Sequence, residues 1–273
     1  MPTGKSQVQS VLNRAGLYHR VKTSSAYDWY WRIVDRSILD DRDAEVTFYK
    51  SVLAGFPSNG LVFDVGANHG AKTDTFLRIG ARVIAIEPDE LNQDILRQKF
   101  LTYRLFKKPV TVVGKALSEK DATQIMWIDE PGSAKNTLSQ KWVETLRVDA
   151  SRFGEALGFS GQKAVTTTTL DQLIAAHGVP YYVKIDVEGH EPSVIRGLHR
   201  PVPFLSFEVN LPEFQPEGLE CIELLGRLSA DGRFNFAADC RKGLSLERWA
   251  GAEAFAKVLA ACEEKSVEVF WKT

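Results

Sequence analysis

A glycine-bearing turn and an acidic residue, each at the end of an apolar run, give the first chemical signal in this sequence. The run Leu61–Val65 opens into a turn with glycines at Gly66 and Gly70, and the run Arg82–Ile86 stops at Glu87. Parallel α/β sheets bind ribose-bearing ligands with a strand, a glycine turn, a helix and a second strand that ends in an acidic residue. The glycines allow close approach of the backbone, and the carboxylate accepts hydrogen bonds from the ribose diol. The sequence therefore predicts a nucleoside-binding site.

The residues of the turn indicate which nucleoside it binds. Dinucleotide sites require G-x-G-x-x-G, but Asn68 occupies the second glycine position here and would crowd a pyrophosphate. Asp64, just before the turn, would also repel phosphate. S-adenosylmethionine carries a ribose, an adenine, an amino-acid tail and a positive sulfonium, and no phosphate, so it suits a turn flanked by carboxylates. The predicted cofactor contacts in and around the turn are Asp64, Gly66, Ala67, Asn68 and Gly70. The alternative is an ordinary strand-to-helix loop built from small residues.

A second group of titratable residues surrounds a strand end at residues 181–191. Because ligands of open α/β sheets lie beyond the carboxyl ends of the strands, this turn is expected to face the same crevice as the first. We expect a functional role for Asp186, at the strand end, whereas Glu191 and Glu188 also suit the N-terminus of the next helix. His190 is a candidate base, although a single loop histidine is commonly a surface or capping residue. The spacing of these side chains is not diagnostic of a metal site, and we expect no metal.

A further apolar run at residues 204–209 carries Glu208 near its end. A carboxylate in this position is either a residue of the cleft or a paired polar group at a sheet edge. The sequence leaves both interpretations open.

Composition limits the classes of protein to which the chain can belong. Its 273 residues are 44% hydrophobic with a formal net charge of −1, which suits a globular domain and argues against nonspecific nucleic-acid binding. The cysteines Cys221, Cys240 and Cys262 have no metal-ligand spacing and are expected to be reduced, buried thiols of a cytoplasmic protein. No apolar run is long enough for a signal core or a membrane span. The oligomeric state is left open.

Strands that alternate with helices indicate one parallel, doubly wound α/β domain at residues 57–273, with an N-terminal helical cover at residues 1–56. The cover contains the aromatic residues Tyr27, Trp29, Tyr30 and Trp31 and helical spacing at residues 45–53. Further helices are expected at residues 90–101 and 246–262, and a capping box at Thr169 opens another that ends at residue 177. A closing hairpin would make the last strand antiparallel. Strands are expected near residues 61–65, 83–87, 110–113, 124–128, 164–168, 183–187, 204–209, 234–237 and 267–271.

Several motifs together resemble the FkbM-type methyltransferases. They are the segments 64–70, 86–88, 168–171, 184–191 and 207–208, in that family's order. The resemblance covers about residues 45–210. It implies a Rossmann-like class I fold with a mostly parallel seven-stranded sheet, S-adenosylmethionine as cofactor, and methyl transfer to a hydroxyl of a sugar, polyketide or other small metabolite.

The resemblance also assigns roles to individual residues. Glu87 would bind the ribose hydroxyls, Pro88 would be a further cofactor contact, Ala116 would lie beside adenine, and Asp186 would lie nearest the transferred methyl group. The segment around residues 133–138 and the N-terminal aromatic residues would shape the acceptor pocket.

Methyl transfer requires in-line positioning and assistance from a base. The catalytic candidates are Asp186 or His190 as the base and Glu208 as the residue that orients the acceptor. Two other classes stay open at this stage: a nicotinamide-dependent oxidoreductase, which Asn68 and Asp64 disfavour, and a binding protein that has kept the sheet and lost catalysis.

Overall fold

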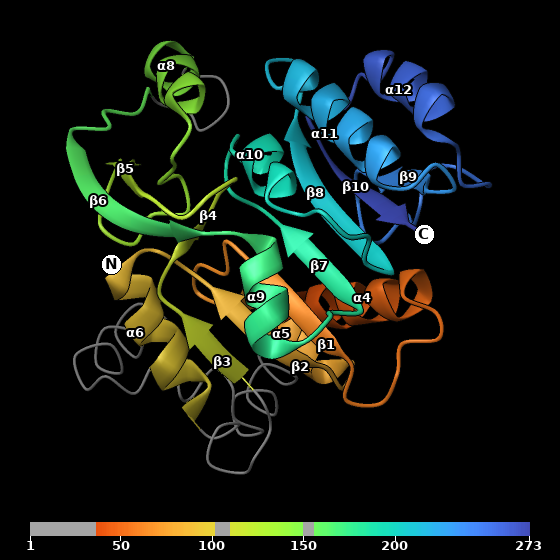
Figure 1. Ribbon diagram of the computed structural model, residues 1–273, viewed down its shortest axis with the longest axis horizontal. Helices are drawn as coiled ribbons and strands as arrows, with labels where there is room; N and C mark the ends of the chain where they lie inside the picture. The colour runs from red at the N-terminus through yellow and green to blue at the C-terminus, as the bar shows by residue number, and fades with distance from the viewer. Residues whose placement is uncertain (1–36, 102–109, 150–155) are drawn as a thin grey trace.

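A seven-stranded sheet forms the centre of the protein in a computed structural model, which describes residues 37–101, 110–149 and 156–273. The strand order is β3-β2-β1-β7-β8-β10-β9, and all neighbours are parallel except β10, which is antiparallel to β8 and β9 (Figure 1). The predicted doubly wound sheet with an antiparallel last strand is therefore confirmed. Its strands are β1 (Leu61–Val65), β2 (Arg82–Ile86), β3 (Val110–Val113), β7 (Tyr182–Ile185), β8 (Phe204–Asn210), β9 (Arg233–Ala237) and β10 (Ser266–Lys272).

Helices cover both faces of this sheet (Figure 1). Successive side chains of a strand point to opposite faces, so Val62 of β1 packs with Tyr49 and Phe76, whereas its neighbour Phe63 joins the larger core on the other face with Leu173. Both Val62 and Phe63 are fully buried. The helices are α4 (Ser37–Val52), α5 (Ala71–Arg78), α6 (Glu90–Lys99), α8 (Gln140–Val148), α9 (Leu170–His177), α10 (Glu191–Arg196), α11 (Gln215–Leu228) and α12 (Ala252–Ala260).

The chain order of the strands reverses between β1 and β7. From β1 the chain proceeds through β2 to β3 on one side, and β7 and β8 continue on the other. Such a switch point opens a crevice at the carboxyl ends of the two central strands. The two turns singled out in the sequence follow these strands, so the fold brings them together.

A second sheet of three strands lies beside the first and was not foreseen as a separate unit. It has the order β4-β6-β5, with β4 (Ala116–Leu117), β5 (Thr123–Ile128) and β6 (Gly161–Thr168). The strands expected near residues 124–128 and 164–168 exist, but they pair antiparallel with each other. Together with α8 they form a separate layer next to the crevice (Figure 1).

The expected helix at residues 246–262 is shorter in the structure and begins only at α12. The preceding residues are extended because β9 engages their backbone. Asn235 bonds both the N–H and the carbonyl of Leu246 through its side chain, and Phe234 and Ala250 exchange two backbone hydrogen bonds.

The predicted N-terminal cap of α9 is present. The Thr169 hydroxyl accepts a hydrogen bond from the Gln172 N–H at 3.2 Å. The Gln172 side chain does not complete a capping box, because it accepts from Thr168 Oγ1 at 2.5 Å instead.

The described part of the expected N-terminal cover is α4, which packs on the sheet through Phe48 and Tyr49. Tyr27, Trp29, Tyr30 and Trp31 lie outside the described residues, and the boundary at residue 56 stays a prediction. The cysteines are unpaired; Cys221 is buried, whereas Cys240 and Cys262 are partly exposed, contrary to the expectation that all three are buried. None of the helices in the described ranges combines the length and apolarity needed to cross a membrane.

Candidate functional site

The turn between β1 and α5 uses its own backbone N–H groups internally. Gly66 and Ala67 both donate to the carbonyl of Ile86, at 3.0 and 3.1 Å, and Asn68 donates to Glu87 Oε2 at 2.8 Å. The next two N–H groups donate to the Asn68 side chain at 2.5 Å and to the Ala67 carbonyl at 2.7 Å. Within this described turn, none of the five amides is left for a phosphate group, which is what such turns bind in dinucleotide sites.

Close contact between the two turns explains the glycine at position 66. Gly66 has φ +80°, and a Cβ there would lie 1.8 Å from the carbonyl oxygen of Asp186. The Asp186 N–H donates to the carbonyl of Val65 at 3.0 Å. The prediction that both turns face one crevice is therefore confirmed.

Glu87, directly after β2, is held by two backbone amides. Its Oε2 accepts from Asn68 and its Oε1 from Asp89, both at 2.8 Å. Burial raises the pKa of this carboxyl to about 7, against the lowering effect of these two hydrogen bonds. The Asn92 side chain is a third partner, so the ionised carboxylate, with about four acceptor sites, can still accept a hydrogen bond from a ribose hydroxyl.

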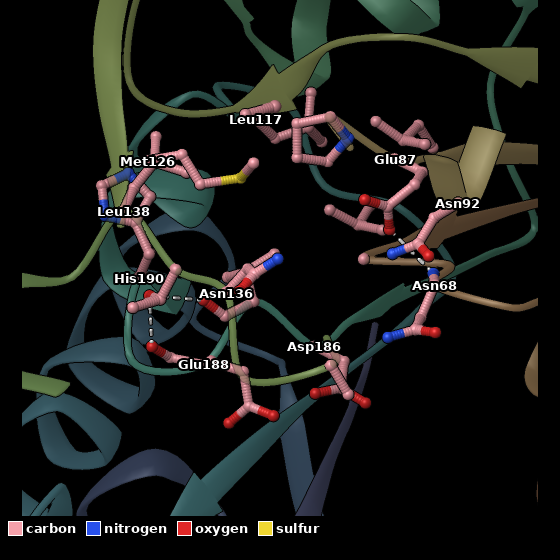
Figure 2. Close-up of a pocket in the computed structure, with 18 of the residues that line it drawn as sticks. Asn68, Glu87, Asn92, Leu117, Met126, Asn136, Leu138, Asp186, Glu188 and His190 are labelled. Atoms are coloured by element: carbon pink, nitrogen blue, oxygen red, sulfur yellow. Dashed lines mark hydrogen bonds between the residues drawn. The ribbon is translucent and has the colours of Figure 1, made fainter. Parts of the chain in front are cut away.

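A cavity of about 770 Å³, part of it open to solvent, lies between the two sheets. Figure 2 shows Asn68 and Glu87 on one side of the cavity, Met126 and His190 on the opposite side, and Asp186 between them. The cavity therefore joins the first turn, the second turn and the three-stranded sheet.

The segment between β5 and α8 forms one wall of the cavity and is bonded to the N-cap of α6 and to the second turn. Asp89 Oδ2 accepts from the Gly132 N–H at 3.1 Å and from Asn136 Nδ2 at 3.3 Å. Thr137 Oγ1 donates to the carbonyl of Glu188 at 2.8 Å. The expectation that residues near 133–138 shape a pocket agrees with this placement.

Asp186 belongs to a charged cluster at the base of the cavity. Lys184 Nζ donates to its Oδ2 at 3.1 Å, and Glu208 shares a hydrogen bond with it. Burial alone would raise the pKa of Asp186, but the charge and hydrogen bond of Lys184, together with the Glu208 hydrogen bond and the Lys72 charge, lower it. Glu208 has its pKa raised to about 7 by burial and by the Asp186 charge. Asp186 is thus the ionised member of the pair near neutral pH.

Glu188 and Glu191 divide between a cavity role and a structural role. Glu191 begins α10, and its Oε1 accepts from the Val187 and Gly189 amides at 3.1 and 3.3 Å, so it supports the turn as expected. Glu188 lines the cavity with φ +53°. Burial and the charge of Asp186 hold the pKa of Glu188 well above its usual range.

His190 lines the cavity from the side of the three-stranded sheet. Its Nε2 lies 3.2 Å from Ser118 Oγ, which also accepts from Gln124 Nε2 at 3.0 Å. Burial lowers the pKa of the imidazole to about 4, so the ring is neutral at physiological pH. A neutral ring can accept a proton, which keeps the predicted role as a base chemically open.

Seven of the predicted site residues line the cavity. They are Gly66, Asn68, Glu87, Pro88, Ala116, Asp186 and His190.

Four others lie behind the cavity wall. Asp64 is 2% exposed and accepts from Thr73 Oγ1 at 2.5 Å, and Ala67 packs in a core cluster with Leu96. A Cβ at Gly70 would lie 2.6 Å from the Leu96 side chain, so helix packing against α6 accounts for this glycine.

Glu208 is the fourth predicted site residue that lies behind the cavity wall. It contacts Asp186 and accepts from Ser266 Oγ at 2.6 Å, so it is a paired polar group and not part of the cavity wall.

Sequence reasoning missed Asn92 and Lys115 in the cavity wall. Asn92 is 1% exposed and hydrogen bonds to Glu87. Asn92 is a polar residue on the buried face of the helix after Glu87, and this position could have indicated a role in the site. Lys115 follows the end of β3, and its position depends on the break between β3 and β4, which the sequence did not reveal.

The charge of the wall favours a cationic ligand over an anionic one. The lining contains three carboxyl groups, Glu87, Asp186 and Glu188, against Lys115, the one lysine or arginine among the described lining residues. Asp186 is ionised near neutral pH, whereas burial raises the pKa of Glu87 to about 7 and that of Glu188 well above its usual range, so a cation in the cavity would also favour their ionisation. Among the residues that the structure describes, no group of three His, Cys, Asp or Glu side chains has the arrangement of a metal site.

Comparison with known proteins adds a family match to this geometry. Residues 64–234, more than half of the chain, match the family model described as Methyltransferase FkbM domain. No curated protein matches the chain.

Solved structures share the fold. The FkbM methyltransferase from Methylobacillus flagellatus superposes with a TM-score of 0.51 and 17% identity, over 83% of this chain and 47% of that protein. The chain thus spans about half the length of that relative. A TehB-like SAM-dependent methyltransferase from Corynebacterium glutamicum (TM-score 0.43, 10% identity, 91% and 96% covered) and precorrin-6y C5,15-methyltransferase from Geobacter metallireducens (0.42, 9%, 85% and 86%) are also similar.

Proposed function

The chain belongs to the FkbM methyltransferase family, and from this premise we propose that it transfers the methyl group of S-adenosylmethionine to a hydroxyl oxygen of a small metabolite or sugar. The family match supports the methyl-transfer class. The cofactor and the acceptor are proposed from the cavity.

The single observation that carries the cofactor proposal is the hydrogen bonding of the first turn. Its five amides already have partners in the protein, and three carboxyl groups face the cavity. A pyrophosphate would find no backbone donors there and would face the ionised Asp186. An adenosyl sulfonium has no phosphate and is attracted by that carboxylate. The same observation argues against a nicotinamide-dependent oxidoreductase.

The donor set of the cavity fits the parts of S-adenosylmethionine. Glu87 keeps an acceptor site for a ribose hydroxyl beside its bonds to Asn68, Asp89 and Asn92. Pro88 and Ala116 offer an apolar surface for adenine. Asn68 and Asp186, at the junction of the two turns, are proposed to bind the methionine end.

When bound, the cofactor supplies an electrophilic methyl group whose bond to sulfur breaks as its bond to the acceptor oxygen forms. The protein residues orient the acceptor and remove its proton. Asp186, held ionised by Lys184, or the neutral His190 accepts that proton, and such assistance typically contributes about 10²–10⁴-fold in rate. Glu208, because it bonds Asp186, is proposed to orient this carboxylate and not the acceptor.

The acceptor is proposed to enter beside the segment that contains Asn136 and Thr137. This wall and His190 lie opposite Glu87 (Figure 2), which leaves polar side chains around the space next to Asp186. Such a surface suits a neutral hydroxyl-bearing molecule.

Calorimetric titration of the protein with S-adenosylmethionine, S-adenosylhomocysteine and NADH tests the cofactor proposal. We expect binding of the first two and none of NADH; binding of NADH alone would overturn the proposal. A screen of hydroxyl-bearing acceptors with isotope-labelled methyl donor then identifies the product by mass spectrometry. Label found on nitrogen but never on oxygen would contradict the proposed hydroxyl acceptor.

A further inference from the structure

A lysine in the middle of the central sheet is an unusual core residue. Lys184 occupies the third position of β7 and is 2% exposed. Burial of an ammonium group is costly unless it is paired. Its Nζ donates to Asp186 Oδ2 at 3.1 Å, and both residues point to the same side of the strand because they are two positions apart. The buried charge therefore lies directly against the carboxylate that borders the cavity.

Charged groups from several elements surround this pair. Besides Lys184 on β7, the groups that act on Asp186 are Glu208 (β8), Asp64 (β1), Lys72 (α5), Glu188 (second turn) and Glu191 (α10). The charges of Asp64, Glu188 and Glu191 oppose ionisation of one more carboxyl beside them, whereas the hydrogen bond from Glu208 lowers the pKa of Asp186.

The ammonium of Lys184 is the nearest opposing charge. Burial lowers the pKa of Lys184, but the carboxylates of Asp186, Glu268 and Glu208 raise it more, so the side chain stays charged at physiological pH. Lys72, the other cation that acts on Asp186, has Glu45 as its ion-pair partner.

We propose that Lys184 is a positioning residue that keeps the carboxylate of Asp186 ionised and fixed at the cavity wall, where it stabilises the positive sulfonium of the cofactor. This inference rests on the proposed function. Lys184 does not line the cavity, so it acts only through Asp186.

The charged methyl donor and its demethylated product provide a readout that needs no acceptor. S-adenosylmethionine carries a positive sulfur, whereas S-adenosylhomocysteine carries a neutral one, and the two share ribose, adenine and amino acid. The relevant ratio is the dissociation constant of S-adenosylhomocysteine divided by that of S-adenosylmethionine. It reports the charge next to sulfur, because a negative group there favours only the sulfonium. Contributions from Glu87 cancel, because the ribose is common to both.

The experiment measures both dissociation constants by calorimetry at pH 6, 7 and 8. In the wild type the ratio should change only slightly with pH, because Asp186 is ionised throughout and Glu208, whose pKa is about 7, lies outside the cavity wall. In Lys184→Met it should fall as the pH is lowered, by up to about tenfold per pH unit below the raised pKa of Asp186. Lys184→Arg, which keeps the charge, should restore a constant ratio. If Lys184→Met does not fold, Lys184→Gln replaces it, since its amide still donates to Asp186 without a charge.

Tyr182→Phe is the matched control. Tyr182 is a buried residue of the same strand whose hydroxyl contacts Ser206 at 2.5 Å and Glu268 at 3.2 Å, so the variant loses buried hydrogen bonds without removing a charge. A general loss of packing would appear in this variant as well, whereas its ratio should stay independent of pH.

The outcomes separate the inference from the proposed function. A wild type that binds neither compound refutes the proposed function. A ratio that Asp186→Asn reduces and Lys184→Met leaves constant with pH overturns the role of Lys184 alone. A ratio that Asp186→Asn leaves unchanged overturns the sulfonium contact of Asp186, and the role of Lys184 with it.

Discussion

Glu87→Gln tests how the carboxylate after β2 contributes to cofactor binding. In the wild type its oxygens accept one backbone amide each at 2.8 Å, from Asn68 and Asp89, and Asn92 is a third partner, which leaves about one acceptor site for a ribose hydroxyl. Glutamine supplies one carbonyl oxygen and one amide group. The amide cannot accept from the ribose hydroxyl, and it also faces a backbone N–H as donor against donor.

The expected loss is that of a charge-assisted hydrogen bond, about 1.5–3 kcal/mol, which corresponds to a dissociation constant raised about 10- to 150-fold. Calorimetric titration with S-adenosylhomocysteine measures this change. Glu90→Gln is the control: it makes the same substitution three residues later, on a side chain that is 79% exposed, and should leave the affinity unchanged.

The pH dependence of affinity gives the same prediction a second test. Burial raises the pKa of Glu87 to about 7, and protonation removes both an acceptor site and the charge that strengthens its bond to the ribose. Protonation therefore competes with binding, so affinity should rise with pH through 7 and level off above it, with a loss of about tenfold between pH 8 and pH 6. This dependence should be absent in Glu87→Gln. An unchanged affinity, or a pH dependence that persists in the variant, would refute the assignment of Glu87 to the ribose.

The turns and the candidate base give further predictions. Gly66→Ala should strongly destabilise the fold in denaturant unfolding, because its Cβ would lie 1.8 Å from the Asp186 carbonyl, whereas Gly80→Ala, also at positive φ but with no atom within 4 Å, should cost only about 1–3 kcal/mol of backbone strain; equal losses would contradict the contact. Glu191→Gln should keep both turn contacts, since both go to Oε1. At pH 8 this variant should not lower the free energy of unfolding, because burial raises the pKa of the carboxyl to about 7 and the buried ionised form is destabilising. Glu191→Ala should lose about 1–3 kcal/mol; a larger loss in Glu191→Gln than in Glu191→Ala would show that the charge itself holds the turn. Asp186→Asn should reduce turnover far more than it reduces affinity for S-adenosylhomocysteine; if turnover instead survives in Asp186→Asn and is lost in His190→Ala, His190 is the base.

Local patterns in the sequence were sufficient to locate the first turn, Glu87 and Asp186. Each follows an apolar run, and the rule that parallel strands end at one edge brings their turns together, as the contact of Gly66 with the Asp186 carbonyl confirms. The sequence did not show why each glycine is needed. Gly66 is required by contact with the neighbouring turn, whereas Gly70 is required by packing against Leu96.

Features that depend on distant partners could not be predicted. Glu208 faces Asp186 because β8 pairs with β7, and His190 meets Ser118 because a separate sheet folds over the crevice. That sheet forms because β5 pairs with β6 across more than thirty intervening residues, and a strand's own residues do not specify such a partner.

A crystal structure of the protein with S-adenosylhomocysteine tests the central claim most directly. We predict the ribose hydroxyls within hydrogen-bond distance of Glu87, adenine against Ala116, and the sulfur facing Asp186. An empty cavity in that crystal, with NADH bound there in a parallel soak, would contradict the account.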